Sequence, residues 1–499
     1  MEALLQGFVI VSEPLNLLLL FAGVALGLFV GALPGLSSPM AITVLLPLTY
    51  PLQTTSALMM LMGVYVGTKL GGSYSAILLR TPGTPSAACT ALDGHPMAEK
   101  GLASQALGYA TIGSTAGGIF GWIIAVTCVP LLAQIAVEAS NADIALIGIV
   151  GLLMVSAFTR GSMLKGLIGV MLGLLIASVG LDPMDSTNRF TFGTVSLMEG
   201  IPFAAALIGF FGVAVVLSDL KLIGRGSEVI ATKVGMALPP IRDILRRWQA
   251  IAIGGFYGTF VGAIPGVGAE SSTWIAYATA KNRSRNKANF GKGEPDGVLA
   301  PEASNNALTG GTMVPMLTLG LPGDGSTAVM LGALVLHGIE PGVMLMKESG
   351  DLVWSILASL LIATLFMFVL GVLAIRGFVT VLQQDRSYLF PFVLVLAVVG
   401  AFAISNNVYP VYIAIIMGVF GYILESRGFP LVTLVLGVIL GPIIEYNARV
   451  ALAMSGNDWS TFLATWPRIG LVALVVVVLV YEVFKHPSQQ KQEEAGRTA

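Results

Sequence analysis

Charged residues are scarce in this chain. Lys and Arg number 26 and Asp and Glu number 27 among 499 residues, and the formal net charge is -1. Proteins that bind nucleic acid carry an excess of basic side chains, so we expect no nucleic-acid partner. Cysteine and histidine are also rare: Cys89, Cys128 and three histidines occur without metal-ligand spacing. We therefore predict no transition-metal site and no cofactor.

The segment before Lys69 contains neither Lys nor Arg. A secretory signal peptide begins with a basic region and ends at a small-residue cleavage site. Neither feature is present near the first residue, so we expect no removable signal peptide.

Hydrophobic residues make up 55% of the chain, and the mean hydropathy is +0.86. That composition excludes an ordinary water-soluble globule. A helix needs about 20 apolar residues to cross a bilayer. Stretches of that kind cover residues 54–70, 104–130, 142–158, 162–180, 200–218, 301–320, 351–375, 389–404, 408–424, 428–447 and 466–484. The sequence therefore predicts an all-α polytopic membrane protein in the lipid bilayer, with about 11 full crossings plus re-entrant elements.

One glycine-rich string occurs twice. GVALGLFVGALPG at 23–35 returns as GGFYGTFVGAIPG at 254–266, with 8 of 13 positions identical and an offset of 231 residues. The glycines lie four apart on one helical face, an arrangement that ordinary helix packing explains. Each copy then ends in Pro-Gly, and a helix break inside apolar sequence is costly unless it lines a cavity. We predict that substrate is bound by the breaks and the residues beyond them: Pro34, Gly35, Ser37, Ser38, Pro265, Gly266, Gly268, Ser271 and Ser272.

Basic loops orient the two copies. Six Lys and Arg residues lie between residues 219 and 247, and five more between 281 and 292. Short basic loops stay on the cytoplasmic side, which places both flanks of the second copy inside and both flanks of the first outside. Five predicted crossings separate the copies, so the second is inverted. Arg449, near Glu445, is the exception to the rule.

Inverted repeats are characteristic of secondary transporters. In this interpretation the chain divides into a first inverted repeat at 1–218, a basic cytoplasmic linker at 219–247, a second inverted repeat at 248–448, an extra C-terminal transmembrane helix at 449–485 and a polar cytoplasmic tail at 486–499. Each repeat holds one helix pair broken at Pro-Gly and one re-entrant hairpin.

The hairpins follow from a second repeated element. LLRTPGTPSAA at 78–88 corresponds to LGLPGDGSTA at 319–328, in segments too short to span twice. Their glycine-hinged tips would present free amides to a carboxylate and free carbonyls to a cation. An ordinary interhelical turn is the alternative. In the hairpin interpretation, the residues predicted to bind substrate at the two tips are Thr81, Pro82, Gly83, Thr84, Ser86, Pro322, Gly323, Ser326 and Thr327.

Three residues are predicted to bind sodium. A carboxylate in an apolar hairpin tip is costly and tends to be functional, so Asp324 is favoured as a cation ligand or proton carrier, with capping of the turn as the alternative. The side-chain carbonyls of Asn305 and Asn306 suit a hard cation, although interhelical hydrogen bonds would also explain them. Lys69 and Arg80 lie near a predicted helix end and are expected to snorkel to the cytoplasmic surface.

These motifs resemble the signature of one family. The doubled glycine string ending in Pro-Gly, TPGTPSA and LPGDGST are similar to the large membrane subunit of the tripartite tricarboxylate transporters, over nearly the whole chain except the polar tail. The resemblance implies a permease of the bacterial inner membrane that imports citrate or another carboxylate with cations. It also implies two partners, a smaller membrane subunit of about four helices and a periplasmic solute-binding protein. Whether the protein forms a dimer is left undecided by the sequence. The charge rule places the C-terminus in the cytoplasm.

The combined prediction is a carrier with its site between two hairpins and two broken helices. Burying a carboxylate without a cation is costly, so a coupling ion, sodium or a proton, is expected. Hairpins that open to opposite sides favour an elevator over a rocking movement. An intramembrane aspartyl protease is one alternative; it would need a carboxylate facing Asp324, from Asp93, Asp143 or Glu270. An ion channel is the other, and protease motifs of the zinc and serine types are absent.

Overall fold

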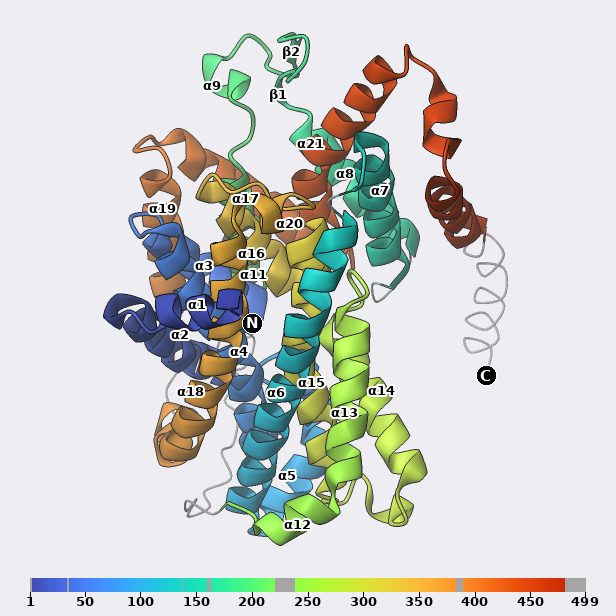
Figure 1. The fold of residues 1–499 in the computed structure, drawn as a ribbon. Coiled ribbons are helices and arrows are strands. Elements are labelled where there is room, and N and C mark those ends of the chain that lie inside the picture. Colours follow the sequence, from blue (N-terminus) through green and yellow to red (C-terminus); the bar gives the residue numbers. More distant parts are fainter. Residues whose placement is uncertain are drawn as a thin grey trace, which may run out of the picture. The chain divides into compact units, whose positions relative to one another are not determined.

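The computed structural model describes residues 2–33, 36–136, 138–158, 163–219, 238–382 and 389–480. These residues are almost entirely helical, with one two-stranded sheet (Figure 1). The chain divides into two compact units, one made of residues 1–137 and 204–423, the other of 138–203 and 424–499. The predicted all-α class is confirmed.

The first unit contains most of the helices. They are α1 (Glu2–Val11), α2 (Pro14–Ala32), α3 (Ser38–Thr49), α4 (Thr54–Leu79), η1 (Pro85–Ala88), α5 (Ala91–Glu99), α6 (Ala103–Ala136), α10 (Phe203–Leu207), η2 (Ile208–Val213), α11 (Ala214–Asp219), α12 (Ile241–Arg246), α13 (Trp248–Gly262), α14 (Gly268–Arg283), η4 (Lys287–Asn289), α15 (Asp296–Leu319), α16 (Gly325–Leu336), α17 (Leu345–Glu348), α18 (Gly350–Leu382), α19 (Leu389–Ala403) and α20 (Tyr409–Ser426). The first residue of α10 and the last three of α20 belong to the second unit.

The second unit contains α7 (Asn141–Phe158), α8 (Met163–Ala177), β1 (Gly180–Leu181), β2 (Asn188–Arg189), α9 (Val195–Met198), α21 (Leu431–Met454), η6 (Trp459–Leu463) and a last apolar helix, Trp466–Val480. Within this unit Arg449 of α21 pairs with Asp182 at 2.6 Å, Asp185 at 2.9 Å and Glu445 at 3.3 Å. Three carboxylates surround this guanidinium, so Arg449, the predicted exception to the charge rule, is a paired charge.

Five of the described helices are long and apolar enough to cross a membrane: α2, α6, α18 over Gly350–Leu373, α20 and α21. Shorter apolar helices, among them α3, α7, α8 and α16, accompany them. The chain is therefore a membrane protein with many hydrophobic helices. The number of crossings and the inverted repeat stay predictions.

Two helices lie in the interior of the first unit. α4 is buried at every residue from Ser56 to Leu79, and α15 at every residue from Gly297 to Thr318. A helix buried on all sides can carry the Ser, Thr and Asn residues that a lipid-facing surface would exclude. Each of these helices ends where a predicted hairpin begins. The first arm of each predicted hairpin is therefore the last part of a long helix, and only the second arm is a helix of its own.

The glycine ladders join these interior helices to their neighbours. In the first copy, Gly23, Gly27 and Gly31 of α2 lie against the carbonyl oxygens of Met60, Val64 and Thr68 of α4. In the second copy, Gly254, Gly258 and Gly262 of α13 lie against those of Ala300, Ser304 and Leu308 of α15. A side chain at any of these glycines would overlap the neighbouring backbone, so the ladders serve helix packing.

The order of these contacts gives the helix directions. Residue numbers rise together along α2 and α4, and along α13 and α15, so each pair is parallel. Between α4 and α15 the order reverses, because Tyr65 contacts Thr312 whereas Ser73 contacts Glu302. The two interior helices are therefore antiparallel, and the two ladder pairs run in opposite directions.

The Pro-Gly turns end against the ladders. Gly83 lies against the carbonyl oxygen of Gly31, and Gly323 lies against that of Gly262. The Gly83 N–H also donates to Gly72 O of α4 at 3.1 Å. Neither turn has room for a side chain at its glycine. Each turn is thereby held at the last glycine of its own ladder, next to an interior helix.

Candidate functional site

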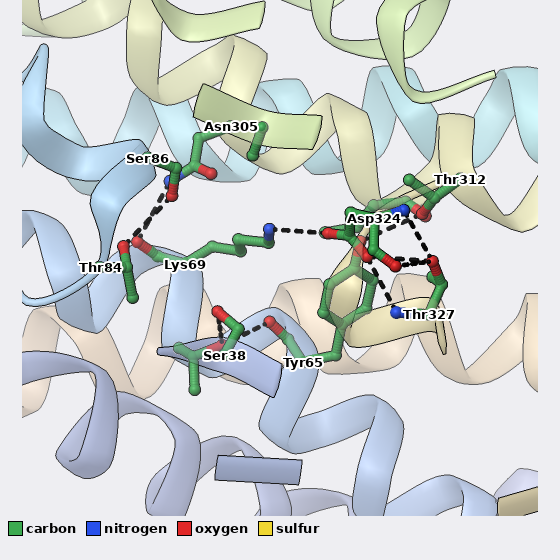
Figure 2. Close-up of polar contacts among 12 residues, drawn as sticks. Ser38, Tyr65, Lys69, Thr84, Ser86, Asn305, Thr312, Asp324 and Thr327 are labelled. Atoms are coloured by element: carbon green, nitrogen blue, oxygen red, sulfur yellow. Dashed lines mark hydrogen bonds and ion pairs between the residues drawn. The ribbon is translucent and has the colours of Figure 1, made fainter. Parts of the chain in front are cut away.

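An ion pair between Lys69 and Asp324 joins the two halves of the sequence. Lys69 Nζ lies 3.3 Å from Asp324 Oδ2, and the two side chains are 4% and 8% exposed. Lys69 lies within α4, and Asp324 directly precedes α16 (Figure 2). The expected snorkelling of Lys69 is wrong, because α4 continues to Leu79 and keeps the ammonium in the interior. Arg80 is exposed, as expected.

The two oxygens of Asp324 have different partners. Oδ1 accepts the N–H of Thr327 at 2.9 Å and closes a capping box at the start of α16. Oδ2 accepts the Tyr65 hydroxyl at 3.0 Å as well as the Lys69 ammonium. The Tyr65 hydroxyl also lies 3.1 Å from Thr312 Oγ1. Asp324 therefore caps a turn, which was the alternative interpretation, and also holds a buried cationic side chain.

The Lys69 ammonium has more hydrogen-bond donors than partners among the described residues. It carries three donors, and its contacts within the described residues are Asp324 and the Tyr65 ring, 5.0 Å from Nζ. Ammonium-carboxylate hydrogen bonds are usually about 2.7–2.9 Å long, so the pair is loosely closed. Lys69 is the one buried Lys or Arg in the part of the chain that the structure describes. It is thus the single buried positive charge available to an anion there.

Polar atoms without partners gather on the neighbouring turn of α15. Asn305 Nδ2 donates to the backbone oxygen of Lys69 at 3.4 Å. Among the described residues, no hydrogen-bond partner exists for four buried atoms nearby: Ser304 Oγ, Asn305 Oδ1, Asn306 Oδ1 and Asn306 Nδ2. Buried polar groups are normally paired. Interhelical hydrogen bonding therefore accounts for one nitrogen of the Asn pair and leaves two carbonyl oxygens open, the ligand type that hard cations prefer.

Sequence reasoning misses a buried carboxylate, Glu302, three residues before this pair. Its Oε1 accepts the hydroxyls of Ser73, at 2.5 Å, and of Thr90, and its Oε2 accepts that of Ser114 at 2.8 Å. The donors come from α4, from the segment before α5 and from α6. The signal that marked Asp324, a carboxylate inside an apolar run, could have found Glu302 as well. No group of three or more His, Cys, Asp or Glu residues able to hold a metal ion occurs in the described ranges.

Three predicted substrate residues of the first half, Ser38, Thr84 and Ser86, lie in two buried hydroxyl pairs. Thr68 donates to Ser38 Oγ at 2.8 Å, and Thr84 Oγ1 lies 3.2 Å from Ser86 Oγ. Figure 2 shows Lys69 between two groups, with Thr84, Ser86 and Asn305 on one side and Tyr65, Thr312, Asp324 and Thr327 on the other. The structure thus brings part of the first turn and part of the second to one lysine.

The other predicted residues of the first half have local roles. Ser37 accepts the N–H of Met40 at 3.4 Å and caps α3. Thr81 donates to Leu79 O at 3.2 Å, next to the half-buried Pro82. Pro34 and Gly35 lie outside the described residues.

In the second half the broken helix meets the turn directly. Gly266 N–H donates to Gly323 O at 3.1 Å, and Pro322, Ser326 and Thr327 are buried beside it. The remaining predicted residues lie just before α14 and in its first turns. Ser272 is buried and donates to Ala269 O of its own helix at 2.9 Å, whereas Pro265, Gly268 and Ser271 are half-buried.

A third buried carboxylate, Asp93 of α5, holds a loop of the second half. Its Oδ1 accepts three backbone N–H groups, from Gly291 at 2.9 Å and from Gly293 and Glu294 at 2.8 Å each. Its Oδ2 accepts the Tyr277 hydroxyl at 2.8 Å. A carboxylate bound in this way fixes the loop rather than acting on a substrate.

Charges next to this loop reinforce it. Arg247 lies 3.3 Å from Asp243, 2.7 Å from Glu294 and 2.8 Å from Asp296. Burial raises the pKa of the Asp243 carboxyl, but the Tyr109 hydrogen bond and the Arg247 charge outweigh it and lower that pKa below its usual value. For Arg247 the effects have the opposite sign: burial lowers the pKa of the guanidinium, but the hydrogen bonds to Asp296 and Glu294 outweigh burial, so the pKa of Arg247 is raised. The loop is therefore held by charged groups as well as by Asp93.

A family model covers nearly all of this architecture. The model of the tripartite tricarboxylate transporter TctA family matches residues 17–436, which include the Lys69–Asp324 pair and the Asn pair. The chain belongs to this family. TctA proteins are the large component of a tripartite transporter, so this TctA chain is a transport component and not an enzyme. Among the described residues, the partners of Asp324 are Lys69, Tyr65 and Thr327, and none of them is a carboxylate.

Two curated relatives of this TctA chain come from Agrobacterium vitis. The "uncharacterized 52.8 kDa protein in TAR-I ttuC' 3'region" is 35% identical over 479 residues, which cover 95% of each chain. The "uncharacterized protein in TAR-II ttuC' 3'region" is 35% identical over 227 residues, which cover 44% of this chain and 94% of that protein. No solved structure matches this TctA chain.

Proposed function

We propose that this chain is the permease subunit of a binding-protein-dependent secondary transporter that imports a tricarboxylate or dicarboxylate, such as citrate, by cation symport. The observation that carries the proposal is the buried Lys69–Asp324 pair, together with the open carbonyl oxygen of Asn305, which contacts the backbone of Lys69, and that of Asn306, the next residue. A buried site with unfilled polar atoms is costly without a ligand, and intramembrane ionisable residues mark transport pathways. Membership of the TctA family supports the transport class.

The substrate carboxylates bind on the hydroxyl side of the site. The first turn offers the hydroxyls of Thr84 and Ser86, and Ser38 adds another from the start of α3. At the second turn the Thr327 N–H is already taken by Asp324, and the buried Ser326 is the proposed hydroxyl donor there. Hydroxyls and one ammonium suit several di- and tricarboxylates, and the binding protein is expected to choose among them.

The coupling cation binds at Asp324. Asp324 Oδ2 is an oxygen ligand of the kind that a hard cation prefers. The open side-chain oxygens of Asn305 and Asn306 on α15 are of the same kind, and Asn305 lies on the Thr84–Ser86 side of Lys69 (Figure 2). Sodium is the proposed ion, and a proton on Asp324 is the alternative. A buried anionic passenger needs a compensating positive charge, so cation binding and carboxylate binding support each other.

Two inverted repeats form the proposed architecture. Its support is the antiparallel order of α4 and α15, together with the matched ladder contacts of α2 and α13. About 11 crossings, a cytoplasmic C-terminus and a bacterial inner-membrane location complete the topology. The partners are a small membrane subunit and a periplasmic solute-binding protein. One gate at each Pro-Gly turn would suit an elevator movement, an argument made by analogy with other hairpin carriers.

Uptake measurements in proteoliposomes test this function. Vesicles containing both membrane subunits receive labelled carboxylates, with or without the binding protein, under a sodium or a proton gradient. We expect saturable, sodium-driven uptake that requires the binding protein. Replacing Asp324 by Ala should abolish it while leaving expression intact. Uptake that never saturates and ignores the binding protein would show a channel instead, and undiminished sodium dependence in Asp324→Ala would remove Asp324 from the site.

A further inference from the structure

We infer that the Lys69–Asp324 pair enforces coupling: the substrate carboxylate takes Lys69 from Asp324, and the coupling cation takes the place of Lys69 at Asp324. This inference rests on the proposed function and adds a binding role for Lys69. In the structure the two side chains neutralise each other in the interior of the first unit. Each is therefore the partner that the other would lose when a ligand arrives.

The contacts of the pair identify Lys69 as the side that moves. Asp324 Oδ1 is fixed by the Thr327 N–H and Oδ2 by the Tyr65 hydroxyl, so Asp324 keeps two hydrogen bonds when the ammonium leaves. Lys69 is joined to Asp324 at 3.3 Å, through a flexible four-carbon stem with spare donors. The loosely held, mobile member of the pair is the lysine.

The repeat geometry indicates where the Lys69 ammonium would meet the substrate carboxylate, namely at the first turn. Gly83 and Gly323 make equivalent contacts with their ladders, so Thr84 follows the first turn where Asp324 follows the second. The first turn thus has a neutral hydroxyl, supported by Ser86, in place of the carboxylate. Figure 2 shows Lys69 between Thr84 and Asp324. A carboxylate bound at Thr84 and Ser86 would lie on the opposite side of Lys69 from Asp324.

The cation has one ligand, Asp324 Oδ2, at the place that Lys69 leaves. Asn305 lies on the other side of Lys69, with Thr84 and Ser86 (Figure 2); its Nδ2 is held by the backbone oxygen of Lys69 at 3.4 Å, which leaves Oδ1 as the open end of that amide. Asn306 Oδ1 is also buried and open. These oxygens have no described partner while Lys69 neutralises Asp324, and an ammonium that leaves Asp324 for the Thr84 side would approach the Asn305 oxygen (Figure 2).

Charge balance then couples the two ligands. The empty pair is neutral, and one carboxylate group on Lys69 with one cation on Asp324 keeps these two positions neutral. Each further carboxylate of a di- or tricarboxylate then needs a further cation or proton. With one ligand alone, one buried charge is left without a partner, a state that proteins avoid. Lys69 is the one buried Lys or Arg of the described chain, so no second basic side chain there relieves the imbalance. A carrier that holds only the carboxylate or only the cation is thereby disfavoured. The carrier without ligands crosses back with the Lys69–Asp324 pair neutral.

Single and double variants test this inference in vesicles with both membrane subunits and the binding protein. Lys69→Met removes the ammonium at nearly equal length, Asp324→Asn removes the negative charge, and the double variant removes both. Lys281→Met serves as the matched control, because Lys281 is exposed on α14. Thermal unfolding in detergent checks that each variant is folded.

Each variant has a distinct expected result. Lys69→Met binds labelled sodium without carboxylate and loses uptake by roughly a hundredfold or more, the scale of an unpaired buried charge. Asp324→Asn binds labelled carboxylate without sodium, and the control behaves as wild type. The double variant, which leaves no unpaired charge and should fold even if a single variant does not, shows neither uptake nor sodium dependence.

The outcomes separate this inference from the proposed function. Wild-type protein that shows no cation-driven carboxylate uptake contradicts the function itself. Sodium-driven uptake by the wild type, together with the same uptake in Lys69→Met or in the double variant, overturns the role of the pair and leaves the function standing. Unchanged sodium dependence of carboxylate binding in folded Asp324→Asn overturns the pair's role in the same way.

Discussion

Ser73 donates a hydrogen bond of 2.5 Å to Glu302. Ser73 belongs to α4 and Glu302 to α15, the two interior helices of the first unit. Both residues are fully buried, so the hydroxyl replaces a water molecule that the carboxylate would otherwise need. The polar residues around Lys69 and Asp324 are therefore part of a longer network that ties α4 to α15.

Replacing Glu302 tests that network. Glu302→Ala leaves three buried hydroxyls without their acceptor and should lower the free energy of unfolding by about 2–4 kcal/mol, at about 1 kcal/mol for each bond. Glu302→Gln keeps an acceptor oxygen for Ser73 and Thr90 and should cost less. Thermal unfolding in detergent measures both, and Ser114→Ala gives the scale for one bond. Equal losses in the Gln and Ala variants would contradict the assigned contacts.

The glycine ladders should respond alike to an added methyl group. Gly27→Ala and Gly258→Ala each place a Cβ on a backbone carbonyl, of Val64 and of Ser304. Overpacking of this kind costs about 1–3 kcal/mol, so both should lower the melting temperature. Gly350→Ala is the control, because no heavy atom lies within 4 Å of a Cβ there. Ladder variants as stable as the control would show that the close contacts are absent.

Asp93 should determine how well its loop is ordered. Asp93→Ala removes the acceptor of the Gly291, Gly293 and Glu294 amides, so hydrogen exchange at these amides should speed up by about tenfold or more. Glu99→Ala, an exposed carboxylate on the same helix, should leave the exchange rates unchanged. Equal protection in the two variants would remove Asp93 from its role.

Acid should weaken the ion pair between Arg247 and Asp243. The pKa of Asp243 is lowered in the folded protein, so its contribution to stability is present above the usual carboxyl pKa of about 4 and is lost as the pH falls through the lowered value. Arg247→Met should be less stable than wild type at neutral pH, and the difference should shrink in acid. Unfolding measured across pH, with Arg242→Met as control, decides this. A difference that does not vary with pH would contradict the pairing.

Local sequence patterns predict a large part of this fold. The doubled glycine string predicts close helix packing, and the ladder contacts of Gly27 and Gly258 confirm it. Composition predicts a helical membrane protein, and the motifs around Gly31 and Gly83 predict the family. These inferences succeed because each depends on residues close together in the chain, where spacing fixes the face of a helix.

The site itself depends on contacts that no local pattern contains. Lys69 is assigned to the surface from sequence because its apolar stretch ends at residue 70, whereas the helix continues to Leu79. Its partner Asp324 is 255 residues away, and Glu302 meets Ser73 across 229 residues. Tyr65 has no distinguishing signal, since an aromatic residue in an apolar helix is usually packing. Only the folded arrangement shows which polar residues of α4 and α15 meet.

Paired fluxes of labelled sodium and labelled carboxylate test the central claim most directly. Proteoliposomes holding both membrane subunits and the binding protein carry either the wild type or Asn306→Leu, which removes one of the open side-chain oxygens of α15 at similar size. The account predicts that the wild type moves both labels in a constant ratio and that the variant loses both fluxes together. Carboxylate uptake at the wild-type rate in Asn306→Leu, with its sodium dependence unchanged, would contradict a cation site on α15.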